Sequence, residues 1–136
     1  MRQISYFQNP KLSVREAGHK GRGVFASVRM VKGEIIEIAP ALPVPKRDDH
    51  RVLATFLVRY VFETERGGRH VIGLGWTSLL NHSPSPNVDF FATTKTVTMK
   101  ARRAIRAEEE LTIDYAWSVA EWAAAGVVLK IGSASR

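Results

Sequence analysis

The stretch of sequence that decides the fold is Asn81-His82-Ser83-Pro84-Ser85-Pro86-Asn87, an irregular segment that lies between apolar ones. Its two X-Pro steps disfavour the α conformation of the preceding serines, so no helix is expected to run through it. Short polar side chains in such a segment hydrogen-bond nearby main-chain groups. Taken alone, the stretch is typical of a surface loop, with Asn81 and Asn87 as turn residues and His82 exposed.

Two further segments stand out on either side of this loop. Glu110-Leu111-Thr112-Ile113-Asp114-Tyr115 begins after 22 residues that follow Asn87, and its alternation predicts a short strand that ends in a half-buried tyrosine. The glutamates at its start are typical of a solvated turn. Gly21-Arg22-Gly23 contains two glycines, which let the backbone approach a ligand closely. It is not a dinucleotide-binding fingerprint, because the third glycine and the following helix are absent.

Short β segments separated by Gly and Pro make up most of the remaining chain, so we expect a mainly β domain. Strands are predicted within 14–25, at 35–38, at 53–62 and as a hairpin of 88–91 with 95–101, and Gly67-Gly68 is a candidate hairpin turn. Asp48 or Asp49 could instead cap a short helical turn before Leu53. Three prolines between Pro40 and Pro45 argue against a central strand there. Only Trp117–Ala125, which Gly126 ends, is predicted to be helical.

A faint internal echo relates two of these segments. Ala26–Glu34 resembles Ala101–Glu109 at an offset of 75 residues. Only two positions match identically, too few to establish a repeat.

Composition bounds the class of protein. With 136 residues and 45% apolar content, the chain fits a single domain, for which we expect a motif-bearing core at 14–115 and a C-terminal tail at 116–136. No apolar run approaches the roughly 20 residues that span a bilayer, and the N-terminal residues lack the plan of a signal peptide. The absence of cysteine excludes disulfides and cysteine-ligated zinc, so no metal is expected. This composition is compatible with an intracellular, reducing compartment.

Charge is distributed unevenly along the chain. The net charge is +7, but the segment from Glu34 to Glu65 has six acids against four bases and is therefore net negative. A solvated surface is the ordinary interpretation of such charges. The basic total also makes nucleic acid a partner to consider, although no aromatic-rich basic motif of the single-strand-binding type is present.

Taken in order, the three segments resemble the SET family of protein lysine methyltransferases, whose pattern is a G-x-G loop, then N-H-S-x-x-P-N, then E-L-T-x-D-Y. Val31-Lys32-Gly33-Glu34-Ile35 is also similar to the start of the strand that follows the family's first loop. The resemblance spans 14–115, which is 102 of the 136 residues. The short chain and the Gly73-Leu74-Gly75-Trp76 run look most like single-domain SET proteins of viruses and bacteria.

The resemblance implies the SET, or β-clip, fold: several small sheets, a last strand that threads under an earlier loop as a pseudoknot, and a short C-terminal helix. It also implies S-adenosyl-L-methionine as cofactor, bound on one face, while the substrate lysine enters from the opposite face through a narrow channel. The NHS and DY segments would cross near the methyl donor. Methyl transfer to an amine is an in-line displacement, so the protein mainly supplies alignment.

The resemblance assigns roles to particular residues. Tyr115 is the catalytic channel tyrosine, expected to act as a positioning and electrostatic group more than as a general base, since a tyrosine pKa lies near 10. Asp114 and Asn87 would pin the pseudoknot. The expected cofactor-binding residues include Asn81, whose side chain would bind the methionine portion, and His82, whose backbone would meet adenine. The others are Lys20, Gly21, Arg22 and Gly23, at the methionine end, and Trp117, which could cover the cofactor or the lysine channel, or simply pack in the core.

The chain also departs from the family pattern. Ser78, Leu79 and Leu80 precede the Asn where the family commonly has Arg-Phe. Pro84 replaces the usual Cys, and Glu108 replaces the usual Gly before the paired acids. No clear Tyr-x-Gly element exists, so Tyr60 is predicted as the second tyrosine of the substrate channel.

Two rival functions stay open at this point: a catalytically inactive SET-like binding module and a basic nucleic-acid-binding domain. If the chain is a methyltransferase, the net negative segment from Glu34 to Glu65 predicts a basic protein or peptide substrate, such as a histone tail or another lysine-rich protein, because opposite charges would steer it to the groove. No membrane partner is expected. The location would be cytoplasmic, or nuclear if host chromatin is the substrate. The sequence is compatible with a monomer or a homodimer.

Overall fold

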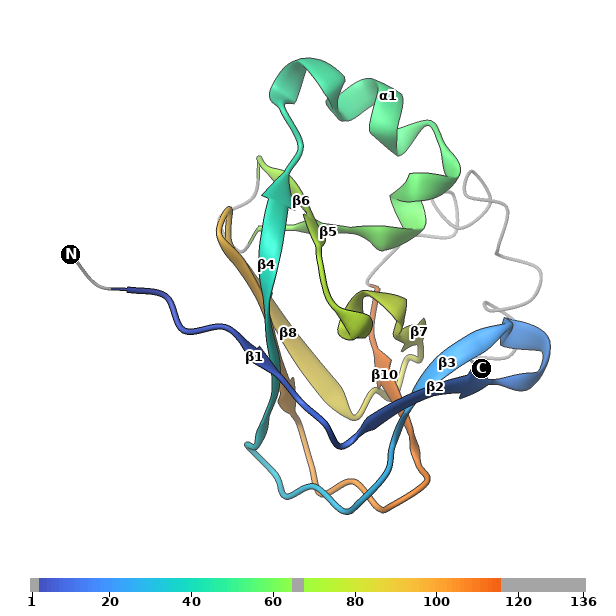
Figure 1. Cartoon of the computed structure of the whole chain (residues 1–136). Coiled ribbons are helices and arrows are strands. Elements are labelled where there is room, and N and C mark those ends of the chain that lie inside the picture. The colour runs from blue at the N-terminus through green and yellow to red at the C-terminus, as the bar shows by residue number, and fades with distance from the viewer. Residues whose placement is uncertain (1–2, 65–67, 116–136) are drawn as a thin grey trace.

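The computed structural model describes residues 3–64 and 68–115, so the predicted helix at Trp117–Ala125 lies outside the described residues. Figure 1 shows strands in two groups that meet at the lower end, with short helical turns at the upper end. The mainly β prediction is confirmed. The elements, in chain order, are β1 (Phe7–Gln8), β2 (Leu12–Glu16), η1 (Gly18–Lys20), β3 (Arg22–Ala26), β4 (Ile35–Pro43), η2 (Lys46–Asp48), α1 (Asp49–Leu53), η3 (Phe56–Tyr60), β5 (Val61–Glu63), β6 (His70–Gly73), η4 (Trp76–Leu79), β7 (Asn81–His82), β8 (Val88–Ala92), β9 (Thr96–Ala101) and β10 (Glu110–Ile113).

The larger sheet is built around β4. Its strand order is β5-β6-β4-β9-β8, and β1 also pairs with β4. The first part of β4 pairs with β9 and the last part with β6, so the expectation that prolines exclude a central strand is wrong as far as Pro43. Pro40 lies where β4 changes partner, and a missing N–H is tolerated at such a point. Its carbonyl still accepts the Leu74 N–H at 2.8 Å.

The predicted strand at 53–62 is wrong over most of its length, because helical turns continue to Tyr60 and only β5 is extended. The Thr55 hydroxyl accepts the Leu57 N–H at 3.2 Å and so begins η3. β5 has β6 as a partner strand, whereas the residues before it satisfy their backbone groups within local turns. Tertiary context therefore overrides β propensity here.

Three further local predictions are confirmed, whereas the expectation of an exposed His82 is wrong, because its side chain is 8% exposed and the residue lies in β7. A short helix, α1, begins at Asp49, although Asp48 makes no side-chain cap hydrogen bond. β5 and β6 form an antiparallel pair, and Gly68 between them has φ +78°. β8 and β9 form the hairpin predicted across Thr93-Thr94. Among the described residues, no helix is long and apolar enough to cross a membrane.

The smaller sheet has the order β2-β3-β10-β7 and places β10 between strands from distant parts of the chain. β10 runs antiparallel to β3, with Leu111 opposite Val24, and parallel to β7, with Thr112 opposite Asn81. Figure 1 shows β10 rising between them. This arrangement agrees with the threaded last strand that the family resemblance implies, a rare departure from unthreaded chains.

Asn87 fastens β10 from the side of the proline-containing loop. Its amide nitrogen donates to the Glu110 carbonyl at 2.8 Å, and its amide oxygen accepts the Thr112 N–H at 2.8 Å. The side chain therefore pairs with β10 as a neighbouring strand would, and the residue is only 2% exposed. Ser83 adds a main-chain bond to the Ile113 carbonyl at 2.9 Å. The structural role predicted for Asn87 is confirmed.

The two segments of the sequence echo lie against each other and form what we call the two-turn tip, residues 27–34 and 102–109. Met30 and Ile105, 75 residues apart, exchange both main-chain hydrogen bonds at 2.8 and 2.9 Å. Equivalent bonds flank them: Ala26 N–H to Glu109 carbonyl at 3.0 Å matches Ala101 N–H to Glu34 carbonyl at 2.9 Å. The tip thus has a local pseudo-two-fold axis, which the weak sequence similarity could not establish.

The side chains and dihedral angles follow the same symmetry. The Glu34 carboxylate accepts the Val31 N–H at 3.1 Å, and the Glu109 carboxylate accepts the Arg106 N–H at 3.0 Å. Gly33 has φ +87°, and Glu108, 75 residues later, has φ +71°. Glu108 is the non-glycine residue with positive φ among the described residues. It stands where the family usually has Gly, so the backbone is strained there.

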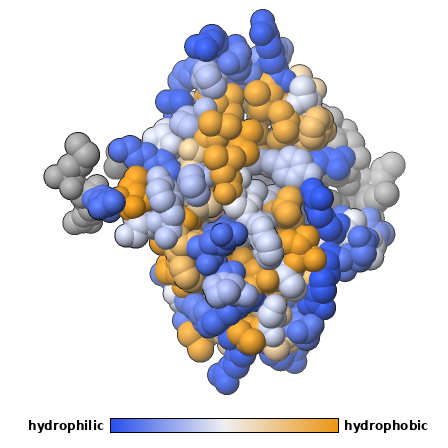
Figure 2. Space-filling model, in the orientation of Figure 1, coloured by the Kyte–Doolittle hydropathy of each residue, from blue (hydrophilic) through white to orange (hydrophobic). Residues whose placement is uncertain are grey.

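One hydrophobic core holds both sheets together. It contains residues of the larger sheet, residues of the smaller sheet and the two central residues of the tip: Leu12, Val24, Ala26, Met30, Ile36, Phe62, Val71, Leu80, Val88, Ala92, Val97, Met99, Ala101, Ile105, Leu111 and Ile113. None of the residues of η2, α1 and η3 is buried. The helical turns therefore lie outside the core. Figure 2 shows apolar and polar residues interspersed on one face of the molecule.

The strain at Glu108 gives a prediction about stability. The free energy of unfolding of Glu108→Gly should exceed that of Glu108→Ala by about 1 kcal/mol, because alanine keeps the strain of the left-handed backbone conformation and glycine relieves it. Both variants lose the same exposed ion pair with Arg15, so that contribution cancels. Urea unfolding measures the difference. The symmetric control, Gly33→Ala, should destabilise by a similar amount, since no atom crowds that position; equal stability of the two Glu108 variants would contradict the prediction.

Candidate active site

A pocket of about 420 Å³ lies where the start of β3, η3 and the chain after β10 approach one another. Six of the residues that the sequence predicted for the site line it: Lys20, Gly21, Arg22, Tyr60, Asn81 and Tyr115. Its volume is in the ordinary range for small-molecule sites. His82 and Gly23 are not among the lining residues, and Trp117 lies outside the described residues.

Tyr115 is held in place by three contacts. Its hydroxyl donates to the Leu80 carbonyl at 2.7 Å, and its main-chain N–H donates to Nδ1 of His82 at 3.0 Å. The His82 and Tyr115 rings meet edge to face, with centroids 5.4 Å apart. Burial raises the pKa of the Tyr115 phenol well above its ordinary value, and the neighbouring Tyr60 adds to the rise. Tyr115 is therefore neutral near pH 7, which agrees with a positioning role.

His82 holds Tyr115 through its imidazole ring, which packs against the Tyr115 ring and accepts the Tyr115 main-chain N–H. Burial lowers the pKa of its imidazole, and Asp114 opposes this only in part. Nδ1 lies 3.7 Å from a carboxylate oxygen of Asp114, a distance compatible with an ion pair. The same nitrogen, however, must keep its lone pair to accept the Tyr115 N–H, so we conclude that His82 is neutral. The sequence predicted His82 as a backbone contact, and its side-chain role could not be inferred.

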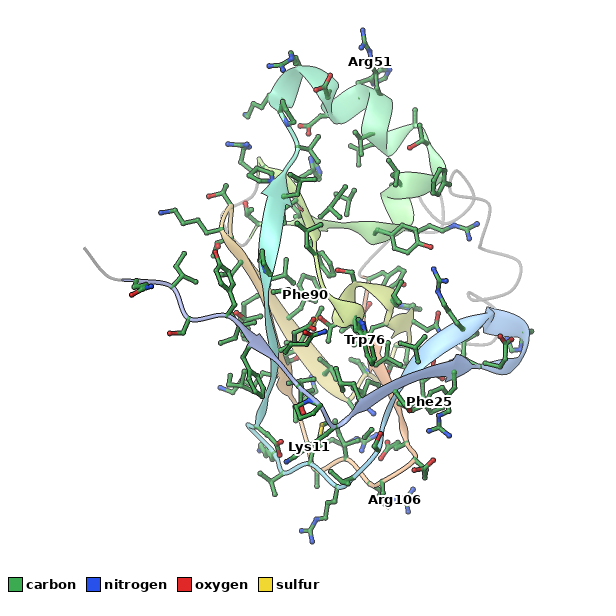
Figure 3. All side chains as sticks on the ribbon, viewed as in Figure 1. Lys11, Phe25, Arg51, Trp76, Phe90 and Arg106 are labelled. Atoms are coloured by element: carbon green, nitrogen blue, oxygen red, sulfur yellow. The ribbon has the colours of Figure 1, made fainter. Side chains whose placement is uncertain are left out.

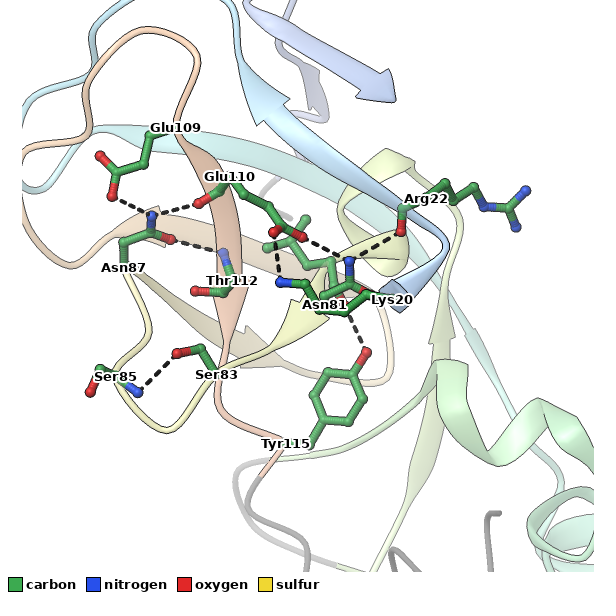
Figure 4. A network of polar contacts seen from close by, with 11 residues as sticks. Lys20, Arg22, Asn81, Ser83, Ser85, Asn87, Glu109, Glu110, Thr112 and Tyr115 are labelled. Atoms are coloured by element: carbon green, nitrogen blue, oxygen red, sulfur yellow. Dashed lines mark hydrogen bonds and ion pairs between the residues drawn. The ribbon is translucent and has the colours of Figure 1, made fainter. Parts of the chain in front are cut away.

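Glu110 links two predicted site residues (Figure 4). One carboxylate oxygen accepts from the Lys20 ammonium at 2.7 Å, and the other accepts from the Asn81 amide nitrogen at 2.7 Å. The same amide nitrogen donates to the Arg22 carbonyl at 3.1 Å. The Glu110 side chain is 17% exposed, so the interpretation of the acidic run as a solvated turn is wrong for this residue.

Gly23 permits this network because it has no side chain. A Cβ there would lie 2.5 Å from a Glu110 carboxylate oxygen and 2.9 Å from the Asn81 amide nitrogen. Any larger residue would push the two side chains away from β3. Gly23 therefore shapes the wall of the pocket without lining it. Gly21 differs, since its φ of +83° is one that glycine adopts freely.

The donor set of the pocket suits a ligand that carries both an amine and a carboxylate. The Lys20 ammonium and nearby main-chain N–H groups would hold the carboxylate. Both amide hydrogens of Asn81 are committed, so its carbonyl oxygen is the atom that can accept from the amine. These residues fit the methionine portion of the cofactor that the family resemblance implies.

Four further lining residues were not predicted: Glu16, Arg59, Ser78 and Leu79. Ser78 and Leu79 stand just before the Asn-His-Ser motif, and that position was the available signal. Two acids of the Glu34–Glu65 segment are used within the fold. Glu34 pairs with Lys11 at 3.2 Å, and Glu37 is buried, where it accepts the Thr77 N–H at 3.1 Å. The predicted steering of a basic substrate by this segment therefore depends on its other acids and stays a prediction.

Comparisons with known proteins agree with this site. The sequence model of the SET domain matches residues 21–116. A histone-lysine N-methyltransferase of Schizosaccharomyces pombe, specific for lysine 37 of histone H3, is 32% identical over 116 residues, covering 83% of this chain and 78% of the relative. The chain belongs to the SET-domain family of protein-lysine N-methyltransferases, as the three motifs predicted.

Solved structures show the same fold. A candidate histone methyltransferase of Plasmodium falciparum superposes with a TM-score of 0.65 at 28% identity, over 82% of this chain and 97% of that one. A structure from work on the product specificity of histone lysine methyltransferases also superposes with a TM-score of 0.65, at 23% identity, over 76% of this chain and 50% of the other chain. The predicted fold is confirmed.

The neutral state of His82 predicts a pH dependence of stability. The pKa is lower in the folded protein than in the unfolded chain, so below about pH 6.5 unfolding takes up a proton and the free energy of unfolding falls. His82→Gln should reduce the change in the free energy of unfolding between pH 7.5 and 5.5, measured by urea unfolding. His50→Gln, which removes an exposed histidine, is the control. Equal slopes in wild type and His82→Gln would contradict the assignment.

Proposed function

We propose that this protein is an S-adenosyl-L-methionine-dependent protein-lysine N-methyltransferase that acts on a lysine in a basic protein tail such as that of a histone. The observation that carries the proposal is the position of Tyr115, whose neutral hydroxyl is fixed at the wall of a pocket that also contains Lys20 and Asn81. The family supports the reaction class, and the histone-specific relative supports the substrate class.

The cofactor would be held at the Lys20–Asn81 wall. The Lys20 ammonium would attract the cofactor carboxylate, and the Asn81 amide oxygen would accept a hydrogen bond from the cofactor amine. Gly21 and Arg22 would contribute main-chain groups. When bound, S-adenosyl-L-methionine supplies a methyl group on a positively charged sulfur. Glu110 keeps Lys20 and Asn81 in one geometry through its two carboxylate oxygens. The protein's part at this end is orientation.

Tyr115 would orient the substrate amine. Its hydroxyl hydrogen is donated to the Leu80 carbonyl, so toward the amine the Tyr115 oxygen would act as an acceptor. A free lysine has a pKa near 10.4 and is protonated near neutral pH. Burial beside Leu79 and Tyr60 would favour the neutral amine, because desolvation disfavours the charged form. Tyr60 remains the predicted second channel tyrosine.

If the substrate is a histone, the protein would act on chromatin and therefore in the nucleus of a host cell. A basic protein outside chromatin would imply the cytoplasm. The test is methylation by radiolabelled cofactor of purified histones and of a cell lysate. Label on a lysine supports the proposal, whereas cofactor binding without any transfer would identify an inactive SET-like module.

Tyr115→Phe should lose most of its turnover while it binds the cofactor within a few-fold of wild type. The phenylalanine ring keeps the packing against His82, but no oxygen remains to orient the amine. Single-turnover rates with a histone substrate, and calorimetric titration with S-adenosylhomocysteine, measure the two effects separately. Turnover close to wild type would remove Tyr115 from the catalytic role.

Asn81→Ala should weaken the binding of S-adenosylhomocysteine about 10- to 100-fold, since a lost buried polar contact is worth about 1–3 kcal/mol. The change removes the amide oxygen that would accept from the ligand's amine. It also removes the two hydrogen bonds by which the Asn81 amide nitrogen bridges the Arg22 carbonyl and the Glu110 carboxylate. Asn9→Ala is a matched control, because Asn9 is another buried asparagine, whose side chain accepts the Lys11 N–H away from the pocket. Unchanged affinity in a folded Asn81 variant would exclude Asn81 from the site.

A further inference from the structure

The two-turn tip carries a concentration of basic residues at the end of the molecule opposite α1 (Figure 1). Its turns contain five exposed bases, and Lys100, at the end of β9 beside them, is exposed as well: Arg29, Lys32, Lys100, Arg102, Arg103 and Arg106. Arg106 is labelled at this end in Figure 3. None of these side chains lines the pocket of the candidate active site.

Ion pairs neutralise every acid of the two turns. Lys11 pairs with Glu34 at 3.2 Å, Arg15 with Glu108 at 2.9 Å, and Arg103 with Glu109 at 2.6 Å. Arg102 pairs with Asp89 of β8 at 2.7 Å. After this pairing, four bases have no carboxylate partner among the described residues: Arg29, Lys32, Lys100 and Arg106. The surplus charge of the tip is therefore positive.

The register of the tip places two of these bases together. Met30 and Ile105 form an antiparallel bridge and are 0% exposed, so both point into the core. By the register of this bridge, the next residues, Arg29 and Arg106, fall at opposing positions, and both are exposed. Like charges directly opposite each other are destabilising. An anion that contacts both would remove this repulsion.

From this arrangement we propose that the two-turn tip binds the phosphate backbone of duplex nucleic acid. Guanidinium groups match phosphate oxygens in a two-pronged geometry, and a duplex presents a closely spaced row of phosphates to several bases at once. The bases are exposed at one end of the molecule and spread over two turns, which suits an extended polyanion more than a small anion. Binding here would leave the active-site pocket open.

The surface composition agrees with an electrostatic contact. The lower end of the molecule in Figure 2 carries hydrophilic residues with a few apolar ones between them, and Val28 and Val31 are the exposed apolar residues of the tip. Two separate valines do not form the aromatic anchors that dominate protein interfaces. Backbone binding of this kind has no sequence preference, and it would hold the enzyme near basic tails that are themselves bound to nucleic acid.

The test is the binding of the full chain to a labelled 20-base-pair duplex of arbitrary sequence, measured by fluorescence anisotropy from 50 to 300 mM salt. Four contacts predict a log–log salt slope of about −3 to −4. The triple variant Arg29→Ala, Lys32→Ala, Arg106→Ala should bind at least 10-fold more weakly at the lowest salt. Its slope should become shallower by about 2 to 3, because each lost phosphate contact removes about 0.9.

The control removes the same net charge elsewhere. Lys46, Arg51 and Lys95 are exposed and have no ion pair among the described residues. The triple alanine variant at these positions should therefore bind the duplex less than 3-fold more weakly than wild type. Thermal unfolding checks that both variants fold, and Arg106→Ala alone serves if the tip variant does not. Equal losses in the two triple variants, no binding by wild type at 50 mM salt, or tighter binding of poly-glutamate than of the duplex would each overturn the proposal.

Discussion

The position of β10 between β3 and β7 is the constraint on which the rest of the structure depends. This one short strand brings Glu110 against β3, places Thr112 opposite Asn81 and ends two residues before Tyr115. Neither neighbour is close to β10 in sequence, so side chains must fasten it, and Asn87 does so with two hydrogen bonds at 2.8 Å. The pocket forms because the strand crosses there. The tyrosine of the pocket and the carboxylate that holds Lys20 and Asn81 both come from this four-residue strand and the two residues after it.

The electrostatics of the site follow from burial around this crossing. Tyr115 and His82 are both kept neutral, one by a raised pKa and the other by a lowered pKa. Lys20 and Glu110 form an ion pair beside Asn81 and compensate each other, and Arg59 also lines the pocket. In the proposed reaction, Tyr115 would face the amine, and the Lys20–Glu110 pair would face the amino-acid end of the cofactor. This division is what a transfer from a cationic donor to an uncharged amine requires, because water and stray charge near the amine would favour its protonation.

Much of the fold and site could be predicted from sequence because it rests on short motifs in fixed order. Residues that contact the pocket directly, such as Asn81 and Tyr115, belong to those motifs, and Lys20 stands immediately before the first of them. Glu110 could not be predicted, since a glutamate in an acidic run is ordinarily solvated and only the approach of β3, allowed by Gly23, buries it. The strand predicted at 53–62 failed because its residues have β propensity but no partner strand. The echo at 26–34 and 101–109 is a symmetry of backbone bonds, which two identical residues could not reveal.

The pseudo-two-fold tip also determines which parts of the molecule can move against one another. Two of the five covalent connections between the sheets pass through it, from β3 to β4 and from β9 to β10. A rotation of one sheet against the other would break hydrogen bonds in both turns together and open the core around Met30 and Ile105. The tip therefore resists rotation of one sheet against the other. The low-stability part is the η2–α1–η3 segment, which buries no residue of its own and carries Tyr60 at the pocket. Entry and release of a ligand would then require only a local rearrangement of that segment, while the wall with Lys20 and Asn81 keeps its shape.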